Sequence, residues 1–228
     1  MYLDERDTLN LSQREEYEPL ITGLFREQLR EGDVVVDVGA HIGYYTLLAA
    51  KLVGSKGHVY SFEPDPKNFR LLEKNVAVNK YRNVTLLNKA AGDRKGTVRL
   101  YQAGYNKGDH RLFDDVKGRS SVEVPMVRVY SVVRKSDLVK VDVQGAEMLV
   151  LEGMKSLLSR ESVKLISEVE PASLRSMGAS AQGYFSDLWK LGFKIQHVNS
   201  SKGRLEPLDE KRFLKEYEHR VSNIFCRK

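Results

Sequence analysis

The feature that most constrains the fold is an apolar run that ends in an acid and two spaced glycines. Residues 34–43 read VVVDVGAHIG, and a second apolar run, HVYSFEP, places Glu63 about twenty residues after the second glycine. In a parallel α/β sheet such glycines let the backbone approach a ligand, while a carboxylate at this separation accepts hydrogen bonds from ribose hydroxyls. The two segments therefore predict an α/β fold with a site for an adenosine-containing ligand.

The glycine turn itself narrows the class of ligand. A dinucleotide-binding turn normally reads G-x-G-x-x-G, but this turn has only Gly39 and Gly43. Asp37 lies just before the turn, where a negative charge would repel a pyrophosphate and attract a ligand that carries an ammonium and a sulfonium group. We therefore expect S-adenosylmethionine as the cofactor. The simpler alternative is a buried strand that leads into a helix, with glycines that serve only packing.

Strand and helix patterns alternate along the chain, which is typical of a parallel sheet with crossover helices. Strands are expected at 34–38, 58–63, 84–88, 138–143 and 163–169, with a closing hairpin formed by 193–198 and 221–226. Helices are expected at 43–53, 66–79, 146–159 and 181–191. Ser12 and Glu15 predict a capping box for a helix that runs to about Arg30. We expect a single domain over residues 1–228, with 1–31 as an N-terminal helical extension.

One stretch departs from this alternation. Residues 90–137 separate two expected strands and contain the polar segment 102–121, QAGYNKGDHRLFDDVKGRSS, between the β-like runs TVRLY and VEVPMVRV. A long loop inside a compact domain is usually functional or disordered. The glycines, charges and aromatic residues of 102–121 favour a substrate-facing lid, and a mobile surface hairpin is the alternative.

The order of five sequence blocks resembles a known family. The blocks are DVGAHIGYYTLLAAK, VYSFEPDPKNFRLLEKNVAVN, LLNKAAGD, LVKVDVQGAEMLVLEGM and LISEVEP, and together they span about residues 33–171. In this order they resemble the FkbM-type S-adenosylmethionine-dependent methyltransferases. The resemblance implies a Rossmann-like class I fold, with a seven-stranded, mostly parallel sheet, an antiparallel C-terminal hairpin and helices on both faces. It also implies methyl transfer, mostly to hydroxyl groups of sugars and small natural products.

The predicted cofactor contacts lie at the carboxyl ends of the strands, where open α/β sheets bind ligands. They are Asp37, Gly39, Ala40, His41, Gly43, Glu63, Pro64, Asn88, Ala90 and Asp142. His41 stands where the family resemblance leads us to expect asparagine, so its side chain either contacts the cofactor or caps the following helix. Gln144 stands where the family pattern commonly has glutamate, and Glu170 stands where it often has histidine. Tyr130 or Ser131 stands where an aspartate usually precedes the strand at 138–143. If these positions serve the acceptor, the acceptor is unusual.

A hydroxyl acceptor must be positioned and must lose a proton, which requires a base or a metal. Asp142 closes the strand at 138–143, and Lys140 points to the same face by strand alternation. Glu147 begins the next helix, and either serves the reaction or only complements the helix dipole. Glu168 ends the next strand. His110, in the long loop, is the most plausible histidine base, although a surface position is the alternative.

Composition bears on the partners of the protein. The net charge is +6, but the basic residues are spread along the chain, which favours a solvated basic surface over a nucleic-acid site. One cysteine, Cys226, and the lack of a Cys/His cluster at zinc spacing predict no disulfide and no metal site. The polar start MYLDERDTLN and the absence of an apolar run of roughly 20 residues predict a cytoplasmic protein without a membrane span.

Three functions are therefore considered. The first is an O-methyltransferase with a small-molecule hydroxyl acceptor. The second is an RNA methyltransferase, because EPDPKNFRLLEKNVAVNK is also similar to tRNA guanine methyltransferases, although no N-P-P-[YF]-like motif follows the strand at 138–143. The third is a non-catalytic protein that binds S-adenosylmethionine, which the presence of Asp37, Gly39 and Glu63 disfavours.

Overall fold

The central element of the protein is one large, twisted sheet. The computed structural model describes residues 1–5, 7, 9–103, 108–114, 118–160 and 162–228. The sheet has eight strands in the order β10-β9-β11-β8-β7-β1-β2-β3. They are β1 (Val34–Val38), β2 (His58–Phe62), β3 (Val84–Leu87), β7 (Leu138–Val141), β8 (Lys164–Val169), β9 (Lys194–Asn199), β10 (Arg204–Pro207) and β11 (Ser222–Arg227). The strands from β3 to β8 are parallel, and β11 inserts antiparallel between β8 and β9.

The predicted mostly parallel sheet with an antiparallel C-terminal pair is confirmed, but the predicted number of seven strands was wrong. The additional strand, β10, pairs only with β9 and forms the edge of the sheet. Its sequence, RLEP, is short and ends in Pro207, which an edge strand tolerates because one side of it makes no ladder hydrogen bonds. Four residues of this composition carry too little alternation to predict a strand.

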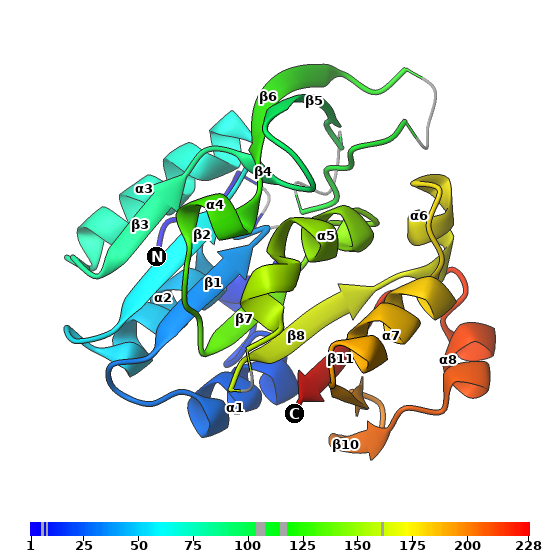
Figure 1. Ribbon diagram of the computed structural model, residues 1–228. Coiled ribbons are helices and arrows are strands. Elements are labelled where there is room, and N and C mark those ends of the chain that lie inside the picture. The colour runs from blue at the N-terminus through cyan, green and yellow to red at the C-terminus, as the bar shows by residue number, and fades with distance from the viewer. Residues whose placement is uncertain (6, 8, 104–107, 115–117, 161) are drawn as a thin grey trace.

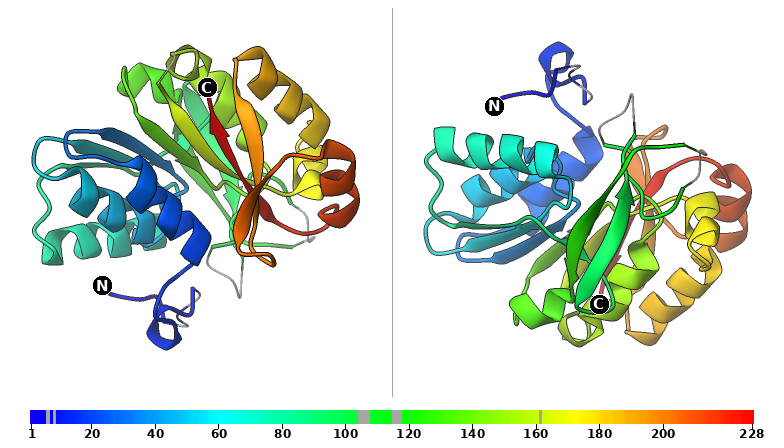
Figure 2. Two further views of the ribbon diagram at one scale, coloured as in Figure 1. Left: turned by 90° about the horizontal axis from the view of Figure 1, so that it is seen from below. Right: turned by 90° about the horizontal axis from the view of Figure 1, so that it is seen from above.

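Helices cover both faces of the sheet (Figures 1 and 2). They are α1 (Pro19–Gln28), α2 (Tyr44–Val53), α3 (Pro66–Val78), α4 (Val129–Val132), α5 (Glu147–Leu158), α6 (Pro171–Ser176), α7 (Ala181–Lys190) and α8 (Glu210–Glu216). Adjacent residues of β1 point to opposite faces: Val35 packs with α1 and α2, whereas Val36 joins the core beneath α5 and α7. None of the helices in the described ranges is long and apolar enough to cross a membrane.

The capping box predicted at Ser12 was wrong. Ser12 lies in a 3-10 turn, Leu11–Gln13, where its hydroxyl donates to Asp7 Oδ2 at 2.5 Å instead of capping a helix. Helix α1 begins only at Pro19, whose fixed φ suits the first helical position. Glu18 before it has a left-handed backbone (φ 41°), so a continuous helix from Ser12 cannot form.

The long connection between β3 and β7 contains a second, smaller sheet. Strands β5 (Gly96–Tyr101) and β6 (Ser121–Val127) pair antiparallel, and β4 (Ala90–Ala91) pairs parallel with β6. The two β-like runs predicted on either side of the polar segment are therefore confirmed. Because β4 follows the carboxyl end of β3 directly, this sheet stands at the edge of the large sheet where ligands are expected (Figure 1).

Candidate functional site

A cavity of about 590 Å³ opens at the carboxyl ends of β1, β2, β7 and β8. The segment before α1 and the loop that contains His110 complete its wall. The predicted cofactor contacts that line it are Asp37, Gly39, Ala40, His41, Glu63, Pro64, Ala90 and Asp142. The predicted catalytic residues that line it are Lys140, Asp142, Glu168 and His110. Gly43, Asn88 and Glu147 are not part of this lining.

The glycine turn after β1 is held by backbone hydrogen bonds. The amides of Gly39 and Ala40 both donate to the Phe62 carbonyl, at 2.9 and 3.0 Å. Gly39 has φ +82°, and a Cβ atom there would lie 1.8 Å from the carbonyl oxygen of Asp142. The glycine is therefore required because the turn packs directly on the end of β7. Gly43 (φ +98°) serves the entry to α2, since a Cβ would lie 2.6 Å from Leu72 Cδ1.

Asp37 presents a carboxylate oxygen that the described residues leave without a partner. The side chain is buried, and its Oδ2 accepts a hydrogen bond from the Thr46 hydroxyl at 2.7 Å, but Oδ1 has no hydrogen-bond donor within the described part of the chain. Burial raises the pKa of Asp37 above its ordinary value. A buried acceptor at the cavity wall fits a ligand that brings its own donor, such as an ammonium group.

His41 contributes a neutral ring to the same wall. Its backbone has a left-handed conformation (φ 51°), and its amide donates to Glu63 Oε2 at 2.8 Å. Burial lowers the pKa of the imidazole to about 4, and both ring nitrogens are buried without a partner among the residues described. Helix α2 begins after Gly43 with no side-chain cap. The ring therefore does not cap the helix and stays available to a ligand in the cavity.

Glu63 lies fully within the wall and is fixed by two backbone amides. Its Oε2 accepts from His41 N, and its Oε1 accepts from Asp65 N at 2.9 Å. Burial raises the pKa of Glu63 to about 8. The Asn88 amide group donates to the Glu63 and Pro64 carbonyl oxygens, at 2.9 and 3.0 Å. Asn88 thus holds the loop that carries Glu63, and it is not among the residues that line the cavity.

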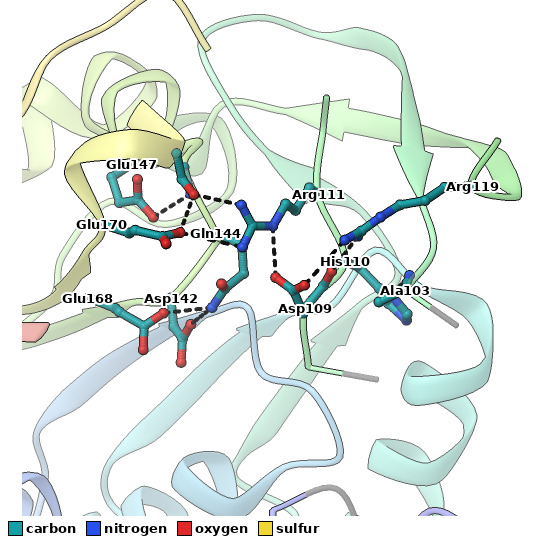
Figure 3. Close-up of polar contacts among 12 residues, drawn as sticks. Ala103, Asp109, His110, Arg111, Arg119, Asp142, Gln144, Glu147, Glu168 and Glu170 are labelled. Atoms are coloured by element: carbon teal, nitrogen blue, oxygen red, sulfur yellow. Dashed lines mark hydrogen bonds and ion pairs between the residues drawn. The ribbon is translucent and has the colours of Figure 1, made fainter. Parts of the chain in front are cut away.

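Two carboxylates meet at the ends of β7 and β8, bridged by one amide (Figure 3). The Gln144 side-chain nitrogen donates to Asp142 Oδ1 at 3.1 Å and to Glu168 Oε1 at 2.6 Å. The Lys140 ammonium, itself buried, lies 2.9 Å from Asp142 Oδ2 and 4.8 Å from the centre of the Tyr45 ring. The sequence placed Lys140 and Asp142 on one face, and the structure brings them into contact.

The environments of the two carboxylates separate their pKa values. Burial opposes ionisation of Asp142, but the Lys140 ammonium outweighs it and holds the pKa of that carboxyl below its ordinary value. Burial and the nearby Asp142 charge raise the pKa of Glu168 well above its ordinary value. Divergent pKa values in neighbouring carboxylates are typical of an acid–base site, with the raised group as the better proton acceptor.

Glu147 lies beneath the cavity. It is buried, its Oε1 accepts a hydrogen bond from Gly145 N at 2.9 Å, and burial raises its pKa to about 7. Gly145 has φ +104°, and a Cβ there would lie 2.8 Å from the Ser173 carbonyl oxygen. Glu147 therefore accepts a backbone hydrogen bond in the turn that holds Gln144, and it does not line the cavity.

His110 is buried, with 8% of its side chain exposed, so the alternative of a surface histidine does not apply. Its Nδ1 accepts from the Ala103 amide at 3.0 Å, and its Nε2 lies 3.7 Å from Asp65 Oδ2. Asp65 caps α3, and its Oδ2 also accepts from the Gln102 side chain at 2.5 Å. Figure 3 shows His110 well away from the Asp142–Glu168 pair, close to Ala103.

The described residues 108–112 of the segment predicted as a lid line the cavity, and one of them, Arg111, makes contacts that the sequence did not indicate. The Arg111 guanidinium donates to Asp109 Oδ1 and Ser173 Oγ, both at 2.7 Å, and to Glu170 Oε2 at 3.4 Å (Figure 3). The loop is thereby fastened to the start of α6. Residues 104–107 and 115–117 of the predicted lid lie outside the described residues.

The N-terminal segment also enters the site, which no local signal in the sequence indicated. Tyr17 and Glu18 line the cavity, and Glu18 Oε2 accepts from the Tyr45 hydroxyl at 2.7 Å. Burial raises the pKa of Glu18, against the lowering effect of Lys140. Across the described residues, no group of three or more His, Cys, Asp or Glu side chains is arranged to hold a metal ion.

Comparison with known proteins identifies the family. The model of the methyltransferase FkbM domain matches residues 37–195. A protein-L-isoaspartate O-methyltransferase of Methanothrix thermoacetophila is 42% identical over 59 residues, which are 26% of this chain and 28% of that protein. The hexuronic acid methyltransferase AglP of Haloferax volcanii is 27% identical over 172 residues, which are 70% of this chain and 66% of that protein. The chain thus covers less than two thirds of the length of either relative.

A solved structure gives the same result for the fold. The methyltransferase FkbM of Methylobacillus flagellatus superposes with a TM-score of 0.57 at 14% identity, covering 87% of this chain and 44% of that chain. This likeness confirms the predicted class I methyltransferase fold. The family model extends over most of the chain and includes the turn after β1, Glu63 and the Asp142–Glu168 pair. The chain therefore belongs to the FkbM family of S-adenosylmethionine-dependent methyltransferases.

Proposed function

We propose that the protein methylates a hydroxyl oxygen of a sugar or another small metabolite. The observation that carries the proposal is the pair of bridged carboxylates, Asp142 and Glu168, in the wall of the cavity that Glu63 also lines. A hydroxyl acceptor needs a proton acceptor beside it, and this pair supplies one with a raised pKa. The similarity to a hexuronic acid methyltransferase supports a sugar acceptor.

The donor half of the cavity fits S-adenosylmethionine by its chemistry. Asp37 Oδ1 is a buried acceptor without a donor among the described residues, and it suits the ammonium group. Glu63 suits the ribose hydroxyls, and the unpartnered His41 ring suits a polar group nearby. When bound, S-adenosylmethionine supplies a methyl group that the acceptor oxygen takes as the carbon–sulfur bond breaks.

On the acceptor side we assign the base to Glu168 and not to Asp142, the strongest candidate from the sequence. The Lys140 ammonium stabilises the ionised form of Asp142, which makes Asp142 a weak base. Glu168 receives the proton that the acceptor hydroxyl loses, while Gln144, which also donates to Asp142, holds the Glu168 carboxylate in place. We assign His110 a structural role, because it lies beside Asp65 and binds the backbone of its own loop at Ala103.

Replacement of Glu63 with alanine is expected to weaken binding of S-adenosylmethionine and its demethylated product by an order of magnitude or more. A bidentate, charge-assisted contact of this kind contributes about 1.5–3 kcal/mol. Titration calorimetry at pH 8 measures the loss, with Glu73→Ala on α3 as the matched control. Unchanged affinity in Glu63→Ala would contradict the ribose assignment.

The raised pKa of Glu63 also makes cofactor binding dependent on pH. Below its pKa of about 8 the free protein holds a proton on Glu63, and that proton must leave before the carboxylate can accept two ribose hydroxyls. Affinity should therefore rise about tenfold from pH 6 to pH 7, and level off above pH 8. Glu63→Gln cannot ionise at this position, so its cofactor affinity should not rise with pH. The same pH profile of affinity in the variant and the unaltered protein would contradict the assignment to Glu63.

The proposed function is tested with methyl-labelled donor and a panel of monosaccharides and glycosides, with mass spectrometry of the products. Ether formation at a sugar hydroxyl is the expected result. A tRNA transcript forms a separate arm. Methylation of the transcript, with no sugar methylated, would replace the proposal with the RNA alternative.

A further inference from the structure

A second cavity, of about 900 Å³, adjoins the first on the side of α8. The two cavities share Glu18, Glu168 and Val221 in their walls. The second cavity is lined mainly by α8 and by the segment between α8 and β11. This segment lies beside α6 (Figure 1). The proposed base is therefore reached from two directions, through the donor cavity and through this one.

The second cavity is lined by both acidic and basic side chains. Two of the acids are in ion pairs: Glu216 binds Arg212 at 2.8 Å, and Glu218 binds Arg175 at 3.3 Å. Glu168 accepts a hydrogen bond from the neutral amide of Gln144. Glu18 binds Tyr45.

Three basic residues in the same wall have no such partner. The side chains of Lys215, His219 and Arg220 are exposed, and none makes a hydrogen bond or ion pair with any residue that the structure describes. Lys215 and Arg220 thus present cationic groups that no ion pair with a described residue engages, whereas Glu18 and Glu168 in the same wall accept hydrogen bonds from the neutral side chains of Tyr45 and Gln144. Arginine and lysine in such a setting suit a carboxylate or a phosphate group.

We propose that the acceptor carries an anionic group, a carboxylate or a phosphate, which Lys215 and Arg220 bind while its hydroxyl reaches Glu168. This inference rests on the proposed function and specifies its acceptor. In such a complex the anion would lie in the second cavity and the reacting oxygen at the wall that the two cavities share, beside Glu168. The Asp142 carboxylate lines the donor cavity and not the second one, so it would repel the anion there and favour entry of the acceptor through the second cavity.

The test compares acceptors that differ only in charge. Hexuronic acids and hexose phosphates are paired with the corresponding neutral hexoses, as methyl glycosides, and each is assayed for methyl transfer and for binding to protein saturated with S-adenosylhomocysteine. At least one anionic member is expected to bind about tenfold more tightly than its neutral partner. Its KM should rise with ionic strength, because exposed charges are screened by salt. The two anionic sets distinguish a carboxylate from a phosphate ligand.

Variants that remove charge test whether Lys215 and Arg220 cause the preference for anionic acceptors. Lys215→Gln with Arg220→Gln should raise KM for the preferred anionic acceptor about tenfold, leave its neutral partner unchanged and leave the Kd of S-adenosylhomocysteine unchanged. Lys211→Gln is the matched control, because Lys211 is exposed on the same helix but does not line the cavity.

Two results would overturn the proposal: neutral acceptors that bind as well as their anionic partners, or an equal response of KM in the cavity and control variants. An RNA substrate with no binding of the small acids would also overturn it. Failure of the proposed function is distinguishable, since it would appear as a lack of methyl transfer to every sugar, neutral or anionic, while the binding comparison still decides whether the cavity selects anions.

Discussion

Glu168→Gln is expected to slow methyl transfer by about 10²- to 10⁴-fold, the range found when a general base is removed. Glutamine keeps the size of the side chain and an oxygen that can accept the hydrogen bond from Gln144, so the fold of the site should persist. Only the capacity to take a proton is lost. Measurement of kcat at saturating donor, together with the Kd of S-adenosylhomocysteine by calorimetry, separates this effect from cofactor binding, which should change by no more than a few-fold.

The dependence of the methyl-transfer rate on pH is a second test of Glu168 as the base. Burial and the Asp142 charge raise the pKa of Glu168, so its basic form becomes populated only as the pH rises. The rate of the unaltered protein should therefore increase with pH through this ionisation, and Glu168→Gln should lack the increase. Glu152→Gln is the control, because Glu152 is exposed on α5 and does not line the cavity. If Asp142→Asn and not Glu168→Gln removed the pH dependence, the base would be Asp142.

Gly39→Val is expected to abolish cofactor binding and to lower the free energy of unfolding by about 3 kcal/mol or more. Gly39 has φ +82°, and its Cβ position lies 1.8 Å from the Asp142 carbonyl oxygen. A side chain there must push the turn after β1 away from the end of β7, which would displace the walls that carry Asp37 and Asp142 together. Urea unfolding and calorimetry with S-adenosylhomocysteine measure the two effects.

Gly54→Ala provides the control, because Gly54 also has positive φ (+64°) but lies at the end of α2, away from the cavity. Its nearest contact for a Cβ is the flexible side chain of Glu31, at 3.3 Å from Cγ. The variant should lose about 1–3 kcal/mol of stability through backbone strain and keep the Kd of the cofactor. Equal loss of cofactor affinity in both folded variants would mean that the turn contributes only to stability.

Local patterns in the sequence were enough to predict most of the helices and strands of the fold. The apolar runs that became β1, β2, β7 and β8 are contiguous, and the turns between strand and helix depend on glycines and a proline within a few residues. The positions of Asp37 and Glu63 at the cavity follow from this, since the carboxyl ends of parallel strands share one edge. The start of α1 could not be predicted, because Asp7 competes for Ser12 and the backbone of Glu18 interrupts the helix.

The roles within the site depended on contacts that no local pattern encodes. Gln144 joins Asp142 to Glu168 across two strands, and Arg111 reaches Glu170 and Ser173 from a loop far away in the sequence. A pKa depends on burial and on the charges within a few ångströms, and both are set by residues distant along the chain. The sequence by itself determined the parallel part of the sheet, the cofactor class and the edge of the sheet at which Asp37 and Glu63 lie. Only the tertiary structure decided how the pKa values of the two carboxyl groups differ, because only packing brings the Lys140 ammonium into contact with Asp142 and buries Glu168 beside the Asp142 charge.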